Sequence, residues 1–299
     1  MQAKQHIQNA AGQPLVSVII PTFNRAWCLM EAIDSVLAQT YQNYEVIVVD
    51  DGSTDNTNEL LSQCQDISVI KQSNQGVSSA RNRGVTSSKG ELIAFLDSDD
   101  HWLPEKLAAQ VAFFRAHQDA TICQTQEVWI RNNRQIFPKS KHKKESGFFF
   151  ERSLELCLVS PSAVMMKNRM FDDVGLFDES LPACEDYDLW LRTGLRMPIY
   201  LIDKALVIKR GGHTDQLSSN PALDRYRIRS LQKLLEGGNL SLAQKKAVIN
   251  VLRRKCRIVA AGCGKRGKLA EMEYYLDLSQ KFSDTANQGA LGKFLSHPV

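Results

Sequence analysis

The chain has 299 residues, of which 43% are hydrophobic and 23% charged, and its formal net charge is +4. That length can bury one large core together with an appendage. No run of eighteen apolar residues occurs, which argues against a membrane-spanning helix. The first thirteen residues lack the apolar centre of a secretory signal, so we expect them to form a loose leader.

The cysteines are scattered along the chain, odd in number and without CxxC spacing. This pattern suits reduced thiols and argues against a disulfide framework or a zinc site. We therefore expect a cytoplasmic protein. The seven cysteines are Cys28, Cys64, Cys123, Cys157, Cys184, Cys256 and Cys263.

The first two strands are each followed by a polar turn and a helix. An apolar strand begins at Leu15 and is expected to stop at Pro21, and an amphipathic helix carries apolar residues over 29–37. A second strand over Tyr44–Val49 leads into a Gly-Ser turn and a helix that starts near Asp55. These alternating elements predict a mostly parallel sheet with right-handed crossovers.

The third strand ends in a dense acidic cluster. Apolar residues over 92–96 lead directly into Asp97, Asp99 and Asp100. Carboxylates this close repel each other unless a cation lies among them, and open α/β sheets place ligands at strand ends. A divalent metal that holds a diphosphate is one interpretation. The alternative is a solvated acidic turn before a helix beginning at Pro104.

The second half of the chain continues as mixed α/β structure and ends in a basic region. Nine Lys and Arg residues and no acid occur between Ser241 and Lys268, which predicts a basic amphipathic helix interrupted at 262–264 and followed by a more acidic helix. The elements expected before it are a helix over 104–118 with Leu107, Val111 and Phe114 inward, a strand over 121–129, a solvated basic loop over 139–144, a strand over 160–166, a short helix within 171–178 and a helix over 185–195.

Five segments resemble the inverting family 2 glycosyltransferases of the GT-A fold, in the family's order and spacing over the first two thirds of the chain. They are Val18–Arg25, Val48–Asp55, Asn74–Gly84, Phe95–Asp100 and Cys184–Arg192. The resemblance implies an α/β GT-A nucleotide-diphospho-sugar transferase fold: a mostly parallel central sheet flanked by helices, with a C-terminal helical extension. We expect a flexible leader over 1–14, a catalytic domain over 15–214, a basic helical region over 215–283 and a flexible tail over 284–299.

The resemblance also implies roles in donor binding. Thr22 and Phe23 line the base pocket, and Asp51 hydrogen-bonds the base while Asp50 helps or only shapes the turn. Arg81 is a planar, permanently charged partner for phosphate, whereas Arg83 is expected to face solvent. The predicted donor-binding residues are Pro21, Thr22, Phe23, Asn24, Asp50, Asp51, Gln75, Gly76, Arg81, Asp97 and Ser98.

The metal and the catalytic base follow from the same resemblance. Asp99 is implied to face a Mg²⁺ or Mn²⁺ ion, with Asp100 and His213 as further ligands; a surface or turn role for His213 remains open. Asp186 matches the general base that deprotonates the acceptor hydroxyl, and Glu185 would orient it. A helix cap is the alternative role for Asp186.

The predicted function is metal-dependent, inverting transfer of a hexose from a nucleoside-diphosphate donor, a UDP-sugar, to a hydroxyl of a saccharide or lipid-linked acceptor, in bacterial surface polysaccharide or glycolipid synthesis. A catalytically silent nucleotide-sugar-binding protein and a sugar-phosphate nucleotidyltransferase are the alternatives. The latter normally carries a Gly-rich basic loop after its first strand, which this chain lacks.

Two interpretations of the basic C-terminal region stay open. It attaches the protein to the inner face of the membrane through anionic lipid, or it is a helical unit packed on the catalytic domain with its charges in water. No nucleic acid is expected as a partner, because Ser241–Lys268 contains no aromatic residue that could stack on bases.

Overall fold

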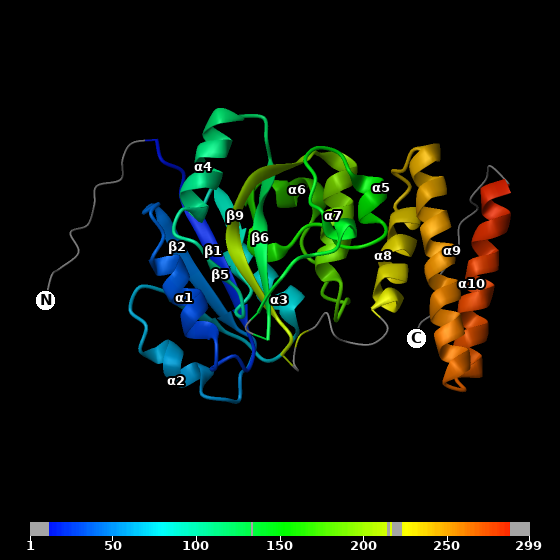
Figure 1. Ribbon diagram of the computed structural model, residues 1–299, viewed down its shortest axis with the longest axis horizontal. Coiled ribbons are helices and arrows are strands. Elements are labelled where there is room, and N and C mark those ends of the chain that lie inside the picture. The colour runs from blue at the N-terminus through cyan, green and yellow to red at the C-terminus, as the bar shows by residue number, and fades with distance from the viewer. Residues whose placement is uncertain (1–11, 133, 214–215, 217–222, 288–299) are drawn as a thin grey trace, which may run out of the picture. The chain divides into compact units, whose positions relative to one another are not determined.

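The computed structural model describes residues 12–132, 134–213, 216 and 223–287 (Figure 1). The chain divides into two compact units, one formed by Met1–Phe149 with Cys157–Gln216 and the other by Phe150–Leu156 with Leu217–Val299. The segment Phe150–Leu156, placed in the catalytic domain from sequence, thus belongs with the C-terminal helices. Residues 1–11 of the proposed leader over 1–14, the boundary at 214–215 and residues 288–299 of the proposed tail over 284–299 lie outside the described residues. The first four residues of that proposed tail belong to the last helix, which runs to Asn287.

The first unit is built on a mixed sheet of order β3-β2-β1-β4-β8-β6-β9-β5, with β7 paired to β6. The four strands β3, β2, β1 and β4 are parallel to one another, as the alternating elements predicted, and antiparallel pairs enter beyond β4. The strands are β1 (Val16–Thr22), β2 (Tyr44–Asp50), β3 (Ser68–Lys71), β4 (Leu92–Phe95), β5 (His101–Trp102), β6 (Ile122–Arg131), β7 (Arg134–Ile136), β8 (Val164–Lys167) and β9 (Ile199–Gly211).

The prediction that Pro21 ends the first strand is wrong, because β1 continues to Thr22. Thr22 bonds toward β2, and Ile19 bonds toward β4 through Leu96. Pro21 lies two residues after Ile19, so its ring nitrogen also faces β4. The register between β1 and β4 ends at Ile19 and does not reach Pro21. A proline costs no ladder hydrogen bond at such a position.

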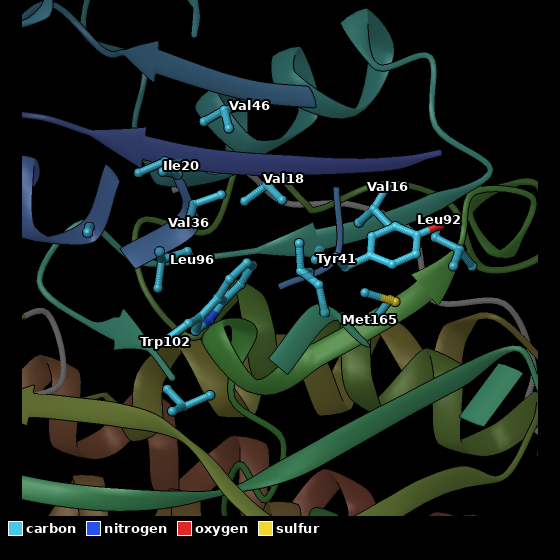
Figure 2. Close-up of a cluster of buried hydrophobic side chains, with 14 of the residues drawn as sticks. Val16, Val18, Ile20, Val36, Tyr41, Val46, Leu92, Leu96, Trp102 and Met165 are labelled. Atoms are coloured by element: carbon cyan, nitrogen blue, oxygen red, sulfur yellow. The ribbon is translucent and has the colours of Figure 1, made fainter. Parts of the chain in front are cut away.

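Helices cover both faces of the parallel half. Alternate β1 residues Val16, Val18 and Ile20 join α1 and α4 in the main core, which Figure 2 shows around Trp102. The predicted inward residues of α4 are buried. The first unit's helices are α1 (Leu29–Leu37), α2 (Thr57–Ser62), α3 (Val77–Ser87), α4 (Lys106–Ala116), α6 (Met170–Val174) and α7 (Glu185–Arg196), with 3-10 turns at Ser140–His142 and Pro161–Ala163.

Helix α3 approaches the opposite face of β1 closely because of Gly84. A Cβ at this position would lie 2.3 Å from Cγ2 of Ile19, a β-branched side chain with no exposed surface. The glycine therefore sets the distance between α3 and the sheet. This contact determines how close to the sheet α3 holds the buried residues of its first turns.

The prediction that 139–144 is a solvated basic loop is wrong for its last residue. Lys144 is buried, with Nζ 3.3 Å from a carboxylate oxygen of Glu127 and 3.0 Å from the carbonyl oxygen of Thr125. Glu127 lies in the middle of β6. A charged side chain needs such a partner when it is buried.

The second unit consists of α5 (Phe150–Ser153), α8 (Asp224–Glu236), α9 (Leu242–Lys265) and α10 (Leu269–Asn287). Ser241 begins α9 with a capping box, in which its hydroxyl accepts from the Gln244 amide. Apolar residues on one face of α9, among them Val248, Leu252 and Val259, are buried. No helix among the described residues is both long and apolar enough to cross a bilayer.

The predicted interruption at 262–264 is wrong, since α9 runs unbroken to Lys265. Each glycine costs a helix about 1 kcal/mol, which burial of neighbours such as Cys263 offsets. At Gly264 a Cβ would lie 2.9 Å from the sulfur of Met272, so this glycine permits the close approach of α10.

Not every cation of α9 lies on its surface. Lys255 is buried, 3.0 Å from Asp224 Oδ1 and 3.1 Å from the carbonyl oxygen of Glu155. Burial alone would raise the pKa of Asp224, but its bonds to Lys255 and Arg227 outweigh burial and lower it. Arg254 pairs with the Glu155 carboxylate. These two cations are paired within the second unit, and membrane contact by the other α9 cations stays a prediction.

We expect Gly84→Ala to destabilise the first unit. The gain in helix propensity, about 1 kcal/mol, is smaller than the roughly 1 to 3 kcal/mol typical of overpacking a core. Urea unfolding should show a net loss of stability, whereas Arg83→Ala on the exposed face of the same helix should change it by less than about 0.5 kcal/mol. Equal stability of the two variants would contradict the close approach.

Candidate functional site

Three strand ends gather the predicted donor-binding residues at one edge of the sheet. The strands β2, β1 and β4 are parallel neighbours, so the residues after Thr22, Asp50 and Phe95 emerge at the same edge. Thr22 and Asp50 are partners in the β1–β2 register. Open α/β sheets bind ligands at this edge.

Asp51 ties the end of β1 to the start of α3. Its amide donates to the carbonyl oxygen of Thr22 at 2.9 Å, and its carboxylate accepts from the amides of Gln75 at 2.9 Å and Gly76 at 2.8 Å. Oδ1 also accepts from the Gln72 side chain. Only one bond falls on Oδ2, which leaves that oxygen capacity for a base N–H.

Polar atoms next to Asp51 are left for a ligand. Thr22 Oγ1 and Ser78 Oγ are buried and have no hydrogen-bond partner among the described residues. Gly76 has φ of +91° and nothing within 4 Å of an added Cβ. Phe23 is 43% exposed, so its ring can stack on a planar group. A base and a diphosphate would satisfy these groups.

Asp50 and Asn24 shape the turns around this edge. Asp50 is buried, and its Oδ1 accepts from the Ser53 amide at 3.0 Å. Asn24 has φ of +54°, and its Oδ1 accepts from the Thr54 amide at 2.8 Å. Of the two roles left open for Asp50, the structure shows the shaping of the turn.

Arg81 is the central cation of the site. One terminal nitrogen of its buried guanidinium is 2.7 Å from Asp97 Oδ1, and the other is 2.6 Å from Glu185 Oε1. Burial alone would lower the pKa of Arg81, but Asp97 and Glu185 outweigh it and raise the pKa above its usual range. The phosphate-binding role stays a prediction, and the guanidinium is already held by two carboxylates.

The acidic cluster after β4 separates into residues with different partners. Asp99 is partly exposed, with Oδ2 2.7 Å from Nε2 of His213. Asp100 is buried and accepts from the Ser162 hydroxyl at 2.6 Å and the Arg210 amide at 2.9 Å. Burial and the neighbouring Asp99 raise the pKa of Asp100 well above its usual range. Ser98 is also buried.

The residues present fit a hard divalent cation held only in part by the protein. Among the described residues, no group of three or more His, Cys, Asp or Glu side chains could enclose a metal. Asp99 and His213 supply two ligand atoms close together. Mg²⁺ commonly binds through one or two carboxylates and completes its shell with phosphates and water.

Asp186 is the accessible acid at the start of α7. Cys184 has φ of +62° just before the helix, and Asp186 Oδ1 accepts from the Tyr187 amide at 2.7 Å. Glu185 and Asp188 are both buried and paired, with Arg81 and Arg192 respectively, whereas Asp186 is partly exposed. The Cys157 thiol lies 3.4 Å from Asp186 Oδ2, and burial raises the pKa of that thiol.

Sequence reasoning missed Lys209. Burial alone would lower its pKa, but Glu127, Asp100, Asp97 and Asp186 outweigh burial and raise it. Its Nζ bonds the Ser160 hydroxyl at 3.1 Å. The available signal was a lysine that directly follows the apolar run Leu206–Ile208 within a strand.

Comparison with known proteins decides the family. The sequence profile described as Glycosyl transferase family 2 matches residues 17–175, which is more than half of the chain. The chain belongs to glycosyl transferase family 2. An uncharacterized glycosyltransferase of Rickettsia typhi is 35% identical over 218 residues, covering 71% of this chain and 68% of that protein. The matched part is 31 to 35% of three longer rickettsial relatives.

A further curated relative is named as a glucosyltransferase, and a solved structure shares the fold. The UDP-Glc:alpha-D-GlcNAc-diphosphoundecaprenol beta-1,3-glucosyltransferase of Escherichia coli is 31% identical over 187 residues, 59% of this chain and 69% of that protein. The crystal structure of S. aureus TarS 1-349 in complex with UDP-GlcNAc aligns over 93% of both chains with TM-score 0.65 and 21% identity. The predicted family and GT-A fold are confirmed, and glycosyl transfer is the family's activity.

The Arg81 ion pairs predict a stability effect. Arg81→Met would leave Glu185 and Asp97 without their cation, and breaking a buried pair in this way typically costs about 3 to 5 kcal/mol. Urea unfolding should show such a loss. Arg83→Met, at an exposed position two residues along α3, should be within about 0.5 kcal/mol of the wild type. An equally stable Arg81→Met protein would mean that the two carboxylates need no cation.

Proposed function

We propose that this enzyme transfers a hexose from a UDP-sugar to an acceptor hydroxyl with inversion at the anomeric carbon. The observation that carries the proposal is the arrangement of acids at the start of α7. Of the acids Glu185, Asp186 and Asp188, only Asp186 is partly exposed. Glu185 is linked through Arg81 to Asp97, which follows β4 among the predicted donor-binding residues. An accessible carboxylate held beside a nucleotide-binding edge is what an inverting transfer needs.

The proposed mechanism uses a single displacement. The Asp186 carboxylate takes the proton of the acceptor hydroxyl while the acceptor oxygen attacks the anomeric carbon. The bond from that carbon to the β-phosphate oxygen breaks, and its electron pair leaves with UDP. Glu185, held by Arg81 at 2.6 Å, fixes the first turn of α7 and so the position of its neighbour. Asp51 orders the loop at Gln75 and Gly76 that would cover the diphosphate.

Asp99 and His213 would hold the divalent cation, Mg²⁺ or Mn²⁺, with Asp100 behind them. The ion would supply charge stabilisation for the departing diphosphate. Asp100 bonds the Arg210 amide at 2.9 Å, three residues before His213, and so holds the end of β9 against the acidic cluster. This contact supports Asp99 and His213 as two ligands of one metal ion.

The donor, acceptor and location are proposed from the relatives and the cysteines. The E. coli relative is named for UDP-Glc and a diphosphoundecaprenol-linked acceptor, and TarS was crystallised with UDP-GlcNAc. We extend to this chain a UDP-sugar donor and a saccharide or lipid-linked acceptor, in surface polysaccharide or glycolipid synthesis. The cysteines are present as thiols, which supports a reducing, cytoplasmic setting.

A donor screen tests the proposal. Nucleoside diphosphate release should be fastest with a UDP-sugar among UDP, GDP and dTDP sugars. Asp186→Asn should lower transfer by roughly a hundredfold to ten-thousandfold, the usual effect of losing a general base, and leave calorimetric UDP binding nearly intact. The exposed Asp172→Asn is the matched control and should behave as the wild type. A loss of UDP affinity in Asp186→Asn would make that residue a donor-side group instead.

Removing the Asp99 carboxylate should weaken metal binding. Calorimetric titration of Mn²⁺ into the UDP complex should show an affinity loss of at least about tenfold to a hundredfold in Asp99→Asn, in line with losses seen around metal sites. Transfer should fall in parallel at limiting Mn²⁺. Asp119→Asn, an exposed acid on the same unit, serves as the control. Unchanged Mn²⁺ affinity would remove Asp99 from the metal site.

A further inference from the structure

A second basic segment belongs to the first unit and is separate in sequence from the C-terminal helices. We call Arg131–Lys143 the basic hairpin; its described residues, 131–132 and 134–143, include the end of β6, strand β7 and the following loop. Between Val128 and Lys144 the sequence has six Lys and Arg and no acid. Lys144 is buried against Glu127. The other five cations are exposed: Arg131, Arg134, Lys139, Lys141 and Lys143.

Apolar side chains are exposed among these cations. Phe137 is 85% exposed and Ile136 is 37% exposed. Ile136 is directly opposite Trp129 in the β6–β7 register, so the two side chains share one face of the hairpin. An exposed aromatic residue beside lysines and arginines matches the composition found where proteins meet a bilayer interface.

The basic hairpin contains an edge strand of the sheet and adjoins the candidate site. Strand β7 pairs with β6 alone and lies off the main strand order. Strands β6 and β9 run in parallel register up to Arg131 and Gly211 (Figure 1). His213, which contacts Asp99, follows Gly211 by two residues. A partner surface that binds the hairpin would therefore lie near the strand ends that carry the candidate site.

We propose that the basic hairpin docks this enzyme on an anionic lipid bilayer. The exposed cations contact the lipid headgroups, and Phe137 enters the interface. Docking brings the site to a membrane-borne acceptor; this last step rests on the proposed function, but docking itself does not. The cations of α9 are the competing surface. They include the internally paired Arg254 and Lys255, and the α9 sequence has no aromatic residue.

Vesicle co-sedimentation with the full chain tests the proposal. The vesicles contain phosphatidylcholine with or without phosphatidylglycerol. The hairpin variant is Arg134→Gln with Arg131→Gln and Lys139→Gln. The matched control removes three exposed α9 cations, through Lys246→Gln, Arg257→Gln and Lys265→Gln. A third variant, Phe137→Ser, removes only the apolar contact.

We expect binding to phosphatidylglycerol vesicles that is lost in 1 M salt, where the Debye length is roughly 3 Å. The hairpin triple variant should lose about a hundredfold in partition coefficient, since each cation near an anionic surface contributes about 1 kcal/mol. Phe137→Ser should bind several-fold more weakly with an unchanged salt dependence. The α9 triple variant should bind as the wild type.

Three results would overturn the proposal: no binding to anionic vesicles, equal binding to phosphatidylcholine alone, or loss of binding in the α9 variant with retention in the hairpin variant. The last result would assign docking to the C-terminal helices. UDP release by slow donor hydrolysis, measured without vesicles, should be unchanged in all three variants. That measurement separates a failure of docking from a failure of the proposed transferase function.

Discussion

The structure depends first on the burial of the Arg81 guanidinium between two carboxylates. Arg81 comes from α3, Asp97 from the end of β4 and Glu185 from the start of α7, so one cation joins segments 104 residues apart in sequence. Neither the arginine nor Glu185 could be buried alone, because an unpaired buried charge is strongly unfavourable. The pairing therefore fixes the end of β4 and the proposed base, Asp186, relative to each other. Gly84 makes it sterically feasible by allowing α3 to approach β1.

A second set of buried charges links the mixed half of the sheet to the same site. Lys144 forms an ion pair with Glu127. Glu127, together with Asp100, Asp97 and Asp186, also raises the pKa of Lys209. Through the Arg210 amide, Asp100 holds β9 near the acidic cluster. The parallel half thus supplies the turns proposed to bind the nucleotide, and the mixed half supplies further charges beside them. Low effective dielectric makes each buried group depend on its partner.

The charged surfaces show why a local count of cations does not identify a docking site. Nine cations between Ser241 and Lys268 left membrane attachment and a packed helical unit both open, and Lys255 among them forms an internal ion pair with Asp224. The shorter Arg131–Lys143 segment keeps its five cations exposed, beside an exposed Phe137. Burial, which depends on packing against other segments, separates structural cations from those that can meet a partner.

The sequence by itself determined the parallel strands and the polar residues at their ends, because strand and helix periodicity and strand-end chemistry are local. It also determined the family, through five short motifs. It could not show that Pro21 stays within its strand, since that depends on which side of β1 lacks a partner. Nor could it reveal the Arg81 pairs or the role of Lys209, whose partners come from other strands and helices. Those contacts were decided only by the tertiary structure, because a buried charge is stabilised by whichever opposite charge the fold brings within a few ångströms, whatever their separation in sequence.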